Sequence, residues 1–314
     1  MTLDDRVILI DKPPGITSFG AVKRVRSVGR LDKVGHCGSL DPFATGLLIL
    51  CTGLGTRVTS LFVDQPKEYL GRVRFGRATD TYDADGRVTE EAPVPAFDSA
   101  TIGAALGAFE GEIQQVPPMV SALKVGGRRL YEMARNGEEI ERAPRPVRVY
   151  GIDLLELGEG FADLRVRCGR GCYVRSIAHD LGQALGVPAH LESLRRLAIG
   201  GLHVDQALSL EQLAAHAAGD AKWPAESVLP LARALDFLPA VHVRSAFETR
   251  VRNGTHPSAQ ALVDAPQAAG LHRVLSDDGR RMLALARSET PRAPLRLDLV
   301  FHTPLAVDTE ASPA

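Results

Sequence analysis

The residue best placed for chemistry is Asp41, which lies in the glycine-punctuated segment 35–46, directly ahead of the apolar run 47–51. Glycines let the backbone turn tightly and approach a ligand, and Pro42 stiffens the chain directly after the carboxylate. One aspartate on a rigid turn favours nucleophilic or base chemistry over metal binding. Asp-Pro pairs are also common turn formers, and the accompanying Gly35, His36 and Gly46 favour the catalytic interpretation.

Four separated segments of the chain resemble the motifs of one enzyme family. They are Lys12-Pro13-Pro14-Gly15-Ile16-Thr17-Ser18, the aspartate segment 35–46, Lys67-Glu68-Tyr69 and Gly171-Cys172-Tyr173-Val174-Arg175-Ser176-Ile177. In this order they resemble the TruB family of tRNA pseudouridine synthases, which isomerise uridine-55 in the T arm of tRNA. Agreement of four separated motifs is far more specific than a match to any one of them.

The resemblance implies that Asp41 is the catalytic aspartate of a base isomerisation. In that reaction the uracil leaves C1′ of the ribose, rotates and rejoins the sugar through C5. A carboxylate can add to C6 of the uracil, add to C1′ of the sugar, or remove the C2′ proton to give a glycal. The sequence leaves these three routes open.

Arg175 and Tyr69 complete the catalytic group that the resemblance implies. Arg175 is expected to pair with Asp41 and to lower the pKa of that carboxyl through charge and hydrogen bonding. The alternative is an arginine at the start of a helix that pairs with Asp180 or points into solvent. Tyr69 is expected to stack on the extruded uracil, and its hydroxyl is a candidate for removing the C5 proton. An aromatic residue in a strand is otherwise a core residue.

Six further residues are expected to hold the nucleotide or the surrounding RNA. They are His36, Tyr173, Lys12, Lys124, Asp83 and Arg196. The resemblance implies that His36 positions the flipped nucleotide or the RNA loop, and that Tyr173 packs beside the site. Asp83 is expected to orient Arg175 or backbone donors, and a simple Asx turn explains its segment equally well.

The composition is that of a globular chain without a basic excess. Its 314 residues are 45% hydrophobic and carry a formal net charge of −1, so any RNA contact has to come from local clusters of positive charge. Basic residues concentrate in 124–148 and 165–196. Glutamates interleave the first cluster, so a solvated charged face explains that segment as well as RNA contact does.

Metal, cofactor and membrane functions find no support in the sequence. The four cysteines have neither the density of a disulfide scaffold nor zinc-ligand spacing. No metal is expected, and an isomerisation that conserves atoms and redox state requires no cofactor. The chain has no G-x-x-x-x-G-K-[ST] loop, no signal-peptide pattern and no apolar run of about 20 residues, which predicts a cytoplasmic protein without a membrane role.

The elements around these residues indicate an α+β fold with a mixed or antiparallel sheet. Strands are predicted at 6–10, 47–51, 68–76, 147–157 and 161–168, and helices at 18–26, 98–108, 174–185 and 209–218. Ser18 is predicted to cap the first helix.

The resemblance also implies a division of the chain into domains. A pseudouridine synthase-like catalytic domain is expected at 1–235, a small β-rich PUA-like RNA-binding domain at 236–304 and a frayed tail at 305–314. Residues 117–146 are expected to leave the main sheet as an RNA-gripping insertion with a turn at Gly126-Gly127. An ordered surface hairpin without a ligand is the alternative.

The sequence thus predicts a monomeric, cofactor-independent tRNA pseudouridine synthase that acts on the T stem-loop without an obligatory protein partner. A guide-RNA-dependent synthase within a ribonucleoprotein is the nearer alternative, and the insertion at 117–146 argues against it. A non-enzymatic RNA-binding protein that retains the fold is the more distant one.

Overall fold

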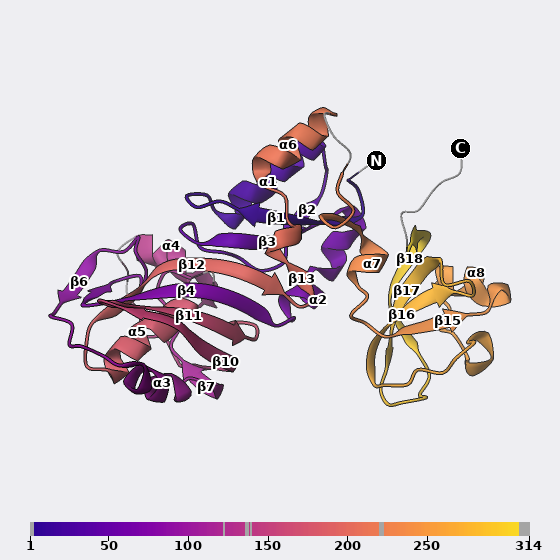
Figure 1. The fold of residues 1–314 in the computed structure, drawn as a ribbon. Coiled ribbons are helices and arrows are strands. Elements are labelled where there is room, and N and C mark those ends of the chain that lie inside the picture. The colour runs from indigo at the N-terminus through magenta and orange to yellow at the C-terminus, as the bar shows by residue number, and fades with distance from the viewer. Residues whose placement is uncertain (1–2, 122, 136–137, 139, 220–222, 308–314) are drawn as a thin grey trace.

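A large, mostly antiparallel sheet organises the structure, a computed structural model that describes residues 3–121, 123–135, 138, 140–219 and 223–307 (Figure 1). Across the sheet the strands are β14 (Val228–Pro230), β1 (Arg6–Lys12), β3 (Thr45–Thr52), β12 (Ala189–Ile199), β4 (Lys67–Phe75), β11 (Phe161–Cys168), β10 (Arg145–Gly158) and β7 (Gly111–Gln115). Two short strands extend it, because β2 (Val34–His36) pairs with β3 and β13 (Leu202–His203) pairs with β12. β3 and β12 run parallel, which makes the sheet mixed, as expected.

Alternating side chains give β4 one buried face. Tyr69, Val73 and Phe75 are buried in a cluster with α3 (Ser99–Gly107) and α5 (Val174–Ala184), whereas Arg72 and Arg74 point to the opposite face. This period of two is what a half-buried strand requires. The sequence pattern therefore decides which side of the sheet Tyr69 faces.

Paired charges cover the opposite face of the sheet. Arg72 lies 2.6 Å from Asp163, Arg74 lies 2.8 Å from Glu192, and Arg195 lies 2.7 Å from Asp11. The first two pairs connect neighbouring strands, and the third connects β12 to β1 across β3. All three pairs are partly exposed. Such pairs contribute about 0–1 kcal/mol each, so their main effect is to leave little unpaired charge on this face.

A second helical layer packs on the strands at the other end of the sheet. α1 (Ser18–Gly29) and α6 (Leu210–Ala218) cover β1 and β3, with Val22, Val25 and Leu213 in the shared core. The short elements that connect these parts are η1 (Gly53–Val58), α2 (Thr59–Val63), β5 (Arg77–Thr79), β6 (Val88–Glu91), η2 (Val204–Gln206) and α7 (Leu231–Ala234).

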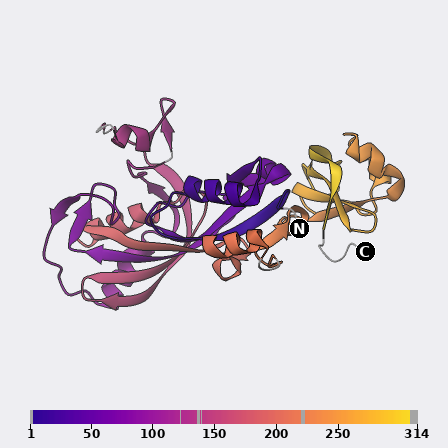
Figure 2. The same ribbon diagram turned by 90° about the horizontal axis from the view of Figure 1, so that it is seen from above.

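Residues 117–144 leave the main sheet in their described part, whereas Arg145 and Pro146, which were expected to belong to the insertion, start β10 and pair with β7. β8 (Lys124–Val125) and β9 (Arg128–Arg129) form a hairpin whose turn is Gly126-Gly127, with φ of +56° and +83°, and α4 (Leu130–Arg135) follows. Met119, Leu130 and Met133 form a small core of their own. Figure 2 shows this magenta hairpin and helix projecting from the body of the molecule.

The β-rich module expected after residue 235 is present. β15 (Ala240–Val243), β16 (Gly270–Ser276), β17 (Arg281–Ser288) and β18 (Arg296–Ala306) form a four-stranded sheet, accompanied by η3 (Ser245–Phe247), α8 (Glu248–Arg252) and η4 (Ala259–Ala261). Met282 and Phe301 share a hydrophobic cluster with Leu9 and Phe62, so the module packs against the larger part of the chain. The tail was expected to begin at residue 305, but β18 continues through Ala306, and 308–314 lie outside the described residues.

The strands and helices predicted for the larger domain are present, but several of its strands were not predicted, among them β7, β12 and β14. In β12, β-bulges between Leu191 and Ser193 and between Arg196 and Ala198 break the alternation that marks a strand. The predicted cap of α1 was wrong by one residue, because the side chain of Thr17 accepts the hydrogen bond from Gly20 N at 2.9 Å. Ser18 has a different partner in the active-site region.

A glycine fixes the contact between β3 and β12. Gly46 has φ of +100°, and a Cβ atom at this position would lie 2.7 Å from the backbone nitrogen of Arg196 and closer still to its carbonyl oxygen. Gly46→Ala is expected to lower the free energy of unfolding by more than about 2 kcal/mol, because the strands would separate and the backbone would be strained. Chemical denaturation measures the change.

Gly103 provides the matched control for that substitution. It is exposed within α3, and an added Cβ would meet nothing within 4 Å. Gly103→Ala should therefore stabilise the protein by about 0.5–1 kcal/mol. Equal effects of the two substitutions would contradict the packing described for Gly46.

Candidate active site

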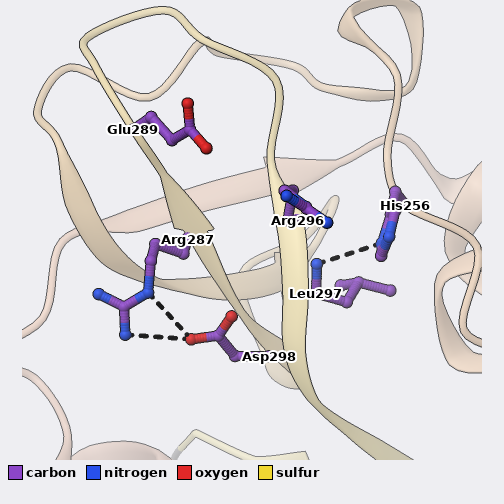
Figure 3. A pocket seen from close by; sticks show the side chains of 6 residues that line it. All are labelled: His256, Arg287, Glu289, Arg296, Leu297 and Asp298. Atoms are coloured by element: carbon purple, nitrogen blue, oxygen red, sulfur yellow. Dashed lines mark hydrogen bonds and ion pairs between the residues drawn. The ribbon is translucent and has the colours of Figure 1, made fainter.

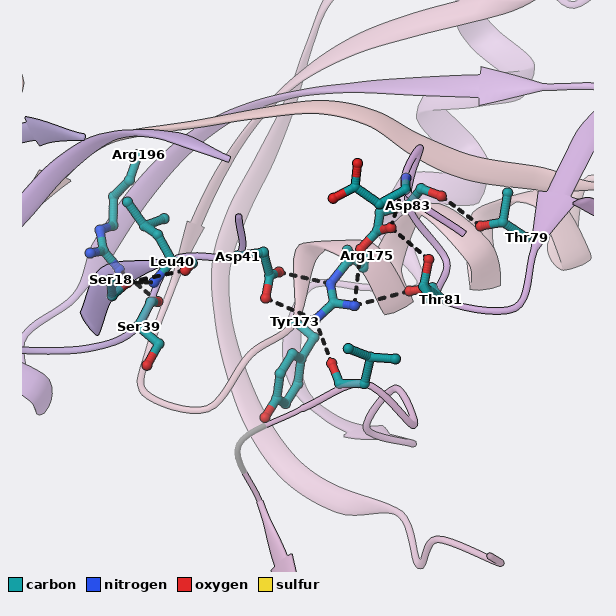
Figure 4. Close-up of polar contacts among 12 residues, drawn as sticks. Ser18, Ser39, Leu40, Asp41, Thr79, Thr81, Asp83, Tyr173, Arg175 and Arg196 are labelled. Atoms are coloured by element: carbon teal, nitrogen blue, oxygen red, sulfur yellow. Dashed lines mark hydrogen bonds and ion pairs between the residues drawn. The ribbon is translucent and has the colours of Figure 1, made fainter. Parts of the chain in front are cut away.

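Asp41 and Arg175 meet at the centre of the site (Figure 4). Nη2 of Arg175 donates a hydrogen bond to Oδ1 of Asp41 at 3.1 Å, and Nε lies 2.8 Å from Oδ2 as an ion pair without an aligned hydrogen bond. The side chain of Arg175 is 2% exposed and that of Asp41 is 34% exposed. The expected ion pair is thus present, with the cation buried and the carboxylate open on one side.

A second carboxylate holds Arg175 from the other side. Oδ2 of Asp83 lies 3.1 Å from Nη1 of Arg175. Oδ1 of Asp83 accepts hydrogen bonds from Thr81 Oγ1 at 2.6 Å and from Asp85 N at 3.1 Å. Asp83 therefore both orients Arg175 and closes an Asx turn, which were the two alternatives left open by the sequence. The alternative pairing of Arg175 with Asp180 is not observed.

Backbone carbonyls bind the remaining edge of the guanidinium. Nη1 of Arg175 donates to Thr81 O and Nη2 donates to Val120 O, each at 3.0 Å. Val120 belongs to the start of the segment that leaves the main sheet, so that segment is connected to the site. With two carboxylates and two carbonyls around it, the guanidinium has one defined orientation.

Burial determines whether the pKa of Asp41 lies above or below its ordinary value. Desolvation raises the pKa of this carboxyl above its ordinary value of 3.8, and the positive charges of Arg175, Lys12 and Arg196 lower it by less. Arg175 lowers this pKa through its charge and its hydrogen bond, as expected, but the burial of the carboxyl outweighs that effect. The desolvation of the carboxylate therefore has a larger effect on this pKa than the charges of the three neighbouring cations.

Lys12 connects the N-terminal segment 12–18 to the aspartate loop, the segment 35–46 that carries Asp41. It is completely buried, and its Nζ donates to Pro13 O and Ile16 O at 2.9 Å and to Pro42 O at 3.2 Å. Burial lowers the pKa of Lys12 to about 8. The three ammonium protons have backbone acceptors, so Lys12 holds Pro42 and with it the adjacent Asp41.

Arg196 holds the same loop from β12. Its side chain is buried, and Nε donates to Leu47 O at 2.7 Å, Nη2 to Gly38 O at 3.1 Å and Nη1 to Ser39 O at 3.4 Å. On the other side of the loop, Ser18 Oγ accepts from Leu40 N at 2.8 Å and donates to Leu40 O at 3.1 Å. The backbone is therefore fixed on both sides just before Asp41.

Tyr69 lies in β4 within the buried cluster that also contains Leu40 and Ala44. Burial raises the pKa of Tyr69 to about 12, although the neighbouring charge of Arg196 and a hydrogen bond to its side chain lower it. The hydroxyl therefore keeps its proton at neutral pH. Tyr69 offers the site a ring and a hydrogen-bond donor rather than a base.

Tyr173 begins the turn into α5. Its backbone N donates to Gln115 Oε1 at 2.7 Å, and Gln115 Nε2 donates back to Tyr173 O at 3.0 Å. Burial raises the pKa of the Tyr173 hydroxyl, and a hydrogen bond with Ser121 lowers it. This clamp fixes the first turn of the helix, from which Arg175 projects toward Asp41 (Figure 4).

His36 and Lys124 complete the set of expected site residues. His36 is half-buried in β2, and burial together with the charge of Arg196 lowers its pKa, which favours the neutral ring. Its Nδ1 is buried and has no hydrogen-bond partner within the described part of the chain. Lys124 lies in β8, and its side chain lies outside the described part of the structure.

Three residues of the site were not identified from the sequence. They are Ser18, which binds the backbone of Leu40, Thr81, which binds Asp83, and Gln115, which binds Tyr173. Thr81 stands in the segment that already drew attention to Asp83. Ser18 and Gln115 act on residues that are distant in sequence, so no local pattern marks them.

The hollow in the β-rich module is separate from this site (Figure 3). It has a volume of about 290 Å³ and is lined by His256, Arg287, Glu289, Arg296, Leu297 and Asp298. Arg287 and Asp298 pair across it at 3.1 Å. Among the described residues there is no group of three or more His, Cys, Asp or Glu side chains arranged to hold a metal ion, and no helix is both long and apolar enough to cross a bilayer.

Solved structures similar to this one include chains from two multi-component assemblies. A chain from the structure titled "Crystal Structure of a Cbf5-Nop10-Gar1 Complex" aligns with a TM-score of 0.73 and 26% identity, covering 96% of this chain and 86% of that one. A chain from "Structure of H/ACA RNP bound to a substrate RNA containing 2'-deoxyuridine" aligns with a TM-score of 0.72 and 25% identity, covering 95% and 85%.

Relatives found by sequence have a higher identity to this chain than the solved structures have, and they carry the same name. The chain is 45% identical to tRNA pseudouridine synthase B of Chromohalobacter salexigens, over 86% of this chain and 87% of the relative. It is 42% identical to the protein of that name from Cupriavidus metallidurans, over 90% of both. Residues 26–174 match the model of the TruB family pseudouridylate synthase N-terminal domain, and 175–236 match that of the tRNA pseudouridylate synthase B C-terminal domain. The chain therefore belongs to the TruB family of pseudouridine synthases.

Proposed function

We propose that the protein converts uridine-55 in the T arm of tRNA to pseudouridine, with Asp41 as the catalytic carboxylate and without a cofactor. The observation that carries this proposal is the arrangement in which the buried Arg175 binds the partly exposed Asp41 and the buried Asp83 at once. It is supported by the name of the relatives, tRNA pseudouridine synthase B. The arrangement directs a fixed carboxylate outward, where a nucleotide can reach it.

Asp41 acts in its ionised form in each of the three chemical routes. A carboxylate oxygen either adds to C6 or C1′ or accepts the C2′ proton. The two contacts of Arg175 favour this ionised form over the acid and hold both oxygens in place. The backbone bonds from Lys12 and Arg196 prevent the loop from moving when the base detaches and rotates.

Tyr69 stacks on the extruded uracil in this account. Its ring belongs to the same buried cluster as the loop residue Leu40, and a planar ring replaces the neighbours that an unstacked base has lost. A pKa of about 12 makes its hydroxyl a poor proton acceptor at neutral pH. The stacking function is therefore favoured over removal of the C5 proton.

The projecting segment with β8, β9 and α4 grips the stem-loop from which the base is flipped. Val120 O binds Arg175, so closure of this segment on RNA is linked to the catalytic ion pair. Flipping costs a few kcal/mol, which stacking and backbone contacts offset. We infer recognition of the folded loop mainly by shape, by a protein that acts as a monomer in the cytoplasm without an obligatory protein partner.

The first prediction concerns the carboxylate itself. Asp41→Asn is expected to abolish tritium release from tRNA labelled at C5 of uridine, because an amide can neither attack the nucleotide nor accept its proton. Binding of tRNA, measured by filter retention, should change less than about threefold, since the RNA contacts lie mainly elsewhere. Release of tritium at more than a trace of the original rate would refute the assignment of Asp41.

The second prediction concerns Asp83. Asp83→Asn keeps the shape of the side chain but removes the charge that faces Nη1 of Arg175, so the guanidinium is held less firmly against Asp41. The rate of isomerisation at saturating tRNA is expected to fall about 10- to 100-fold with little change in KM.

Asp163 provides the control for Asp83. Like Asp83, it forms an ion pair with an arginine, in this case Arg72 on the opposite face of the sheet. Asp163→Asn should leave the rate at saturating tRNA unchanged. If both variants lost activity equally, the effect of Asp83 would be a general loss of stability rather than the positioning of Arg175.

The third prediction concerns pH. Asp41 works as the carboxylate, so activity is lost as the pH falls through its pKa, and burial raises that pKa above 3.8. The acid limb of kcat/KM is therefore expected above 3.8. Asp180 also has a raised pKa, about 6, because of burial, and it does not contact Arg175. Asp180→Asn should therefore leave the pH of the acid limb unchanged. If the acid limb shifted in this variant, Asp180 rather than Asp41 would be the group that titrates there.

A further inference from the structure

One flank of α1 carries a row of exposed side chains beside the active site. Ser18, Ala21, Val22 and Val25 bury the inner face of the helix. Phe19, Lys23, Arg26 and Arg30 are exposed. The first three recur at i, i+4 and i+7, so they lie on one stripe of the helix, and Arg30 follows just past its end as the C-cap residue. We refer to these four residues as the α1 stripe.

The positive charges of the α1 stripe are unpaired. Within the described part of the chain, Lys23, Arg26 and Arg30 make no ion pair, and α1 contains no acidic residue. Arg24 lies on a different flank of the helix. Hydrogen bonds from the backbone of Glu211 and the side chain of Ser209 are the main cause of the lowered pKa of Glu211 on α6, and the charge of Arg24 adds slightly to this lowering. By contrast, Arg72, Arg74 and Arg195 on the exposed face of the large sheet form ion pairs with carboxylates. The α1 stripe thus carries three exposed positive charges without a carboxylate partner among the described residues, in a chain that is almost neutral overall.

An aromatic ring accompanies these charges. Phe19 is 60% exposed, and Nζ of Lys23 lies 5.0 Å from the centroid of its ring. A large apolar ring left in water next to a cation offers a stacking surface for a base and a contact for the adjoining phosphate. Core packing does not explain Phe19, because the neighbouring Ser18 and Ala21 already fill the inner face of the helix.

The location of the α1 stripe connects it to the substrate. Ser18 binds the backbone of Leu40, so Phe19 directly follows a residue that holds the aspartate loop. Figure 2 shows α1 in indigo on the same side of the large sheet as the projecting segment with β8, β9 and α4. An RNA whose base enters the site at Asp41 would therefore pass between that segment and α1.

We propose that the α1 stripe is an RNA-binding surface that holds the substrate RNA next to the flipped nucleotide. Lys23, Arg26 and Arg30 bind backbone phosphates, and the ring of Phe19 stacks on an exposed base. Charge complementarity selects a polyanion, and the aromatic ring selects one with accessible bases. This inference rests on the proposed function, because it assigns further contacts to the same substrate.

The test measures affinity for unmodified tRNA by fluorescence anisotropy over a series of salt concentrations. Lys23→Gln and Arg26→Gln should each weaken binding and reduce the slope of log K against log salt by about 0.7–0.9, the value for one phosphate contact. Phe19→Ala should weaken binding about fivefold or more without changing that slope. In all three variants the rate of isomerisation at saturating tRNA should stay unchanged.

Two controls match these substitutions. Arg87→Gln removes one charge from a side chain that is 92% exposed on another part of the surface, where it pairs with Asp80, and Leu155→Ala shortens an apolar side chain that is 49% exposed. Both should bind tRNA as the unsubstituted protein does. Wild-type affinity and slope in the three α1 variants would overturn the inference, whatever other molecule the stripe contacts.

The same experiment separates this inference from the proposed function. If the unsubstituted protein isomerises uridine in tRNA and the α1 variants bind normally, the inference alone fails. If the unsubstituted protein neither binds nor modifies tRNA, the proposed function fails and the inference fails with it.

Discussion

The arrangement of the active site depends on the burial of one cation. Arg175 is 2% exposed, and a guanidinium removed from water costs several kcal/mol unless carboxylates and hydrogen-bond acceptors replace the lost solvent. Asp41 and Asp83 supply the charge, and two backbone carbonyls supply the remaining acceptors. These groups come from three separate parts of the chain, and Arg175 itself belongs to a fourth, α5. The need to satisfy one guanidinium therefore brings together the aspartate loop, the 79–85 turn, the projecting segment and α5.

Two further buried cations fix the backbone rather than the carboxylates. Lys12 and Arg196 direct their donors to carbonyl oxygens on the two sides of Asp41, and neither ion-pairs with a carboxylate within the described part of the chain. The result is a carboxylate that is close to three positive charges and still partly desolvated. Fixed charges of this kind need no rearrangement during the reaction, which is the main advantage of a preorganised site over water.

The sequence was informative where a local pattern determines the structure and uninformative where distant contacts determine it. The alternation in β4 predicts the inward direction of Tyr69, and the motif around Arg175 predicts its pairing with Asp41. β12 escaped prediction because two bulges interrupt its alternation, although it supplies Arg196. Ser18 looked like a helix cap because only the folded chain brings Leu40 to its hydroxyl. The effect of Arg175 on the pKa of Asp41 was predicted from the motif, but the larger, opposite effect of burial was not, because burial cannot be seen in a motif.

We propose that this arrangement isomerises one uridine of tRNA without a partner. The decisive measurement is mass spectrometric mapping of unmodified tRNA after incubation with the purified protein alone, without metal or nucleotide cofactor. One new pseudouridine is expected, at position 55 of the T arm. Pseudouridine elsewhere in the tRNA, or none until a guide RNA or second protein is added, would contradict it.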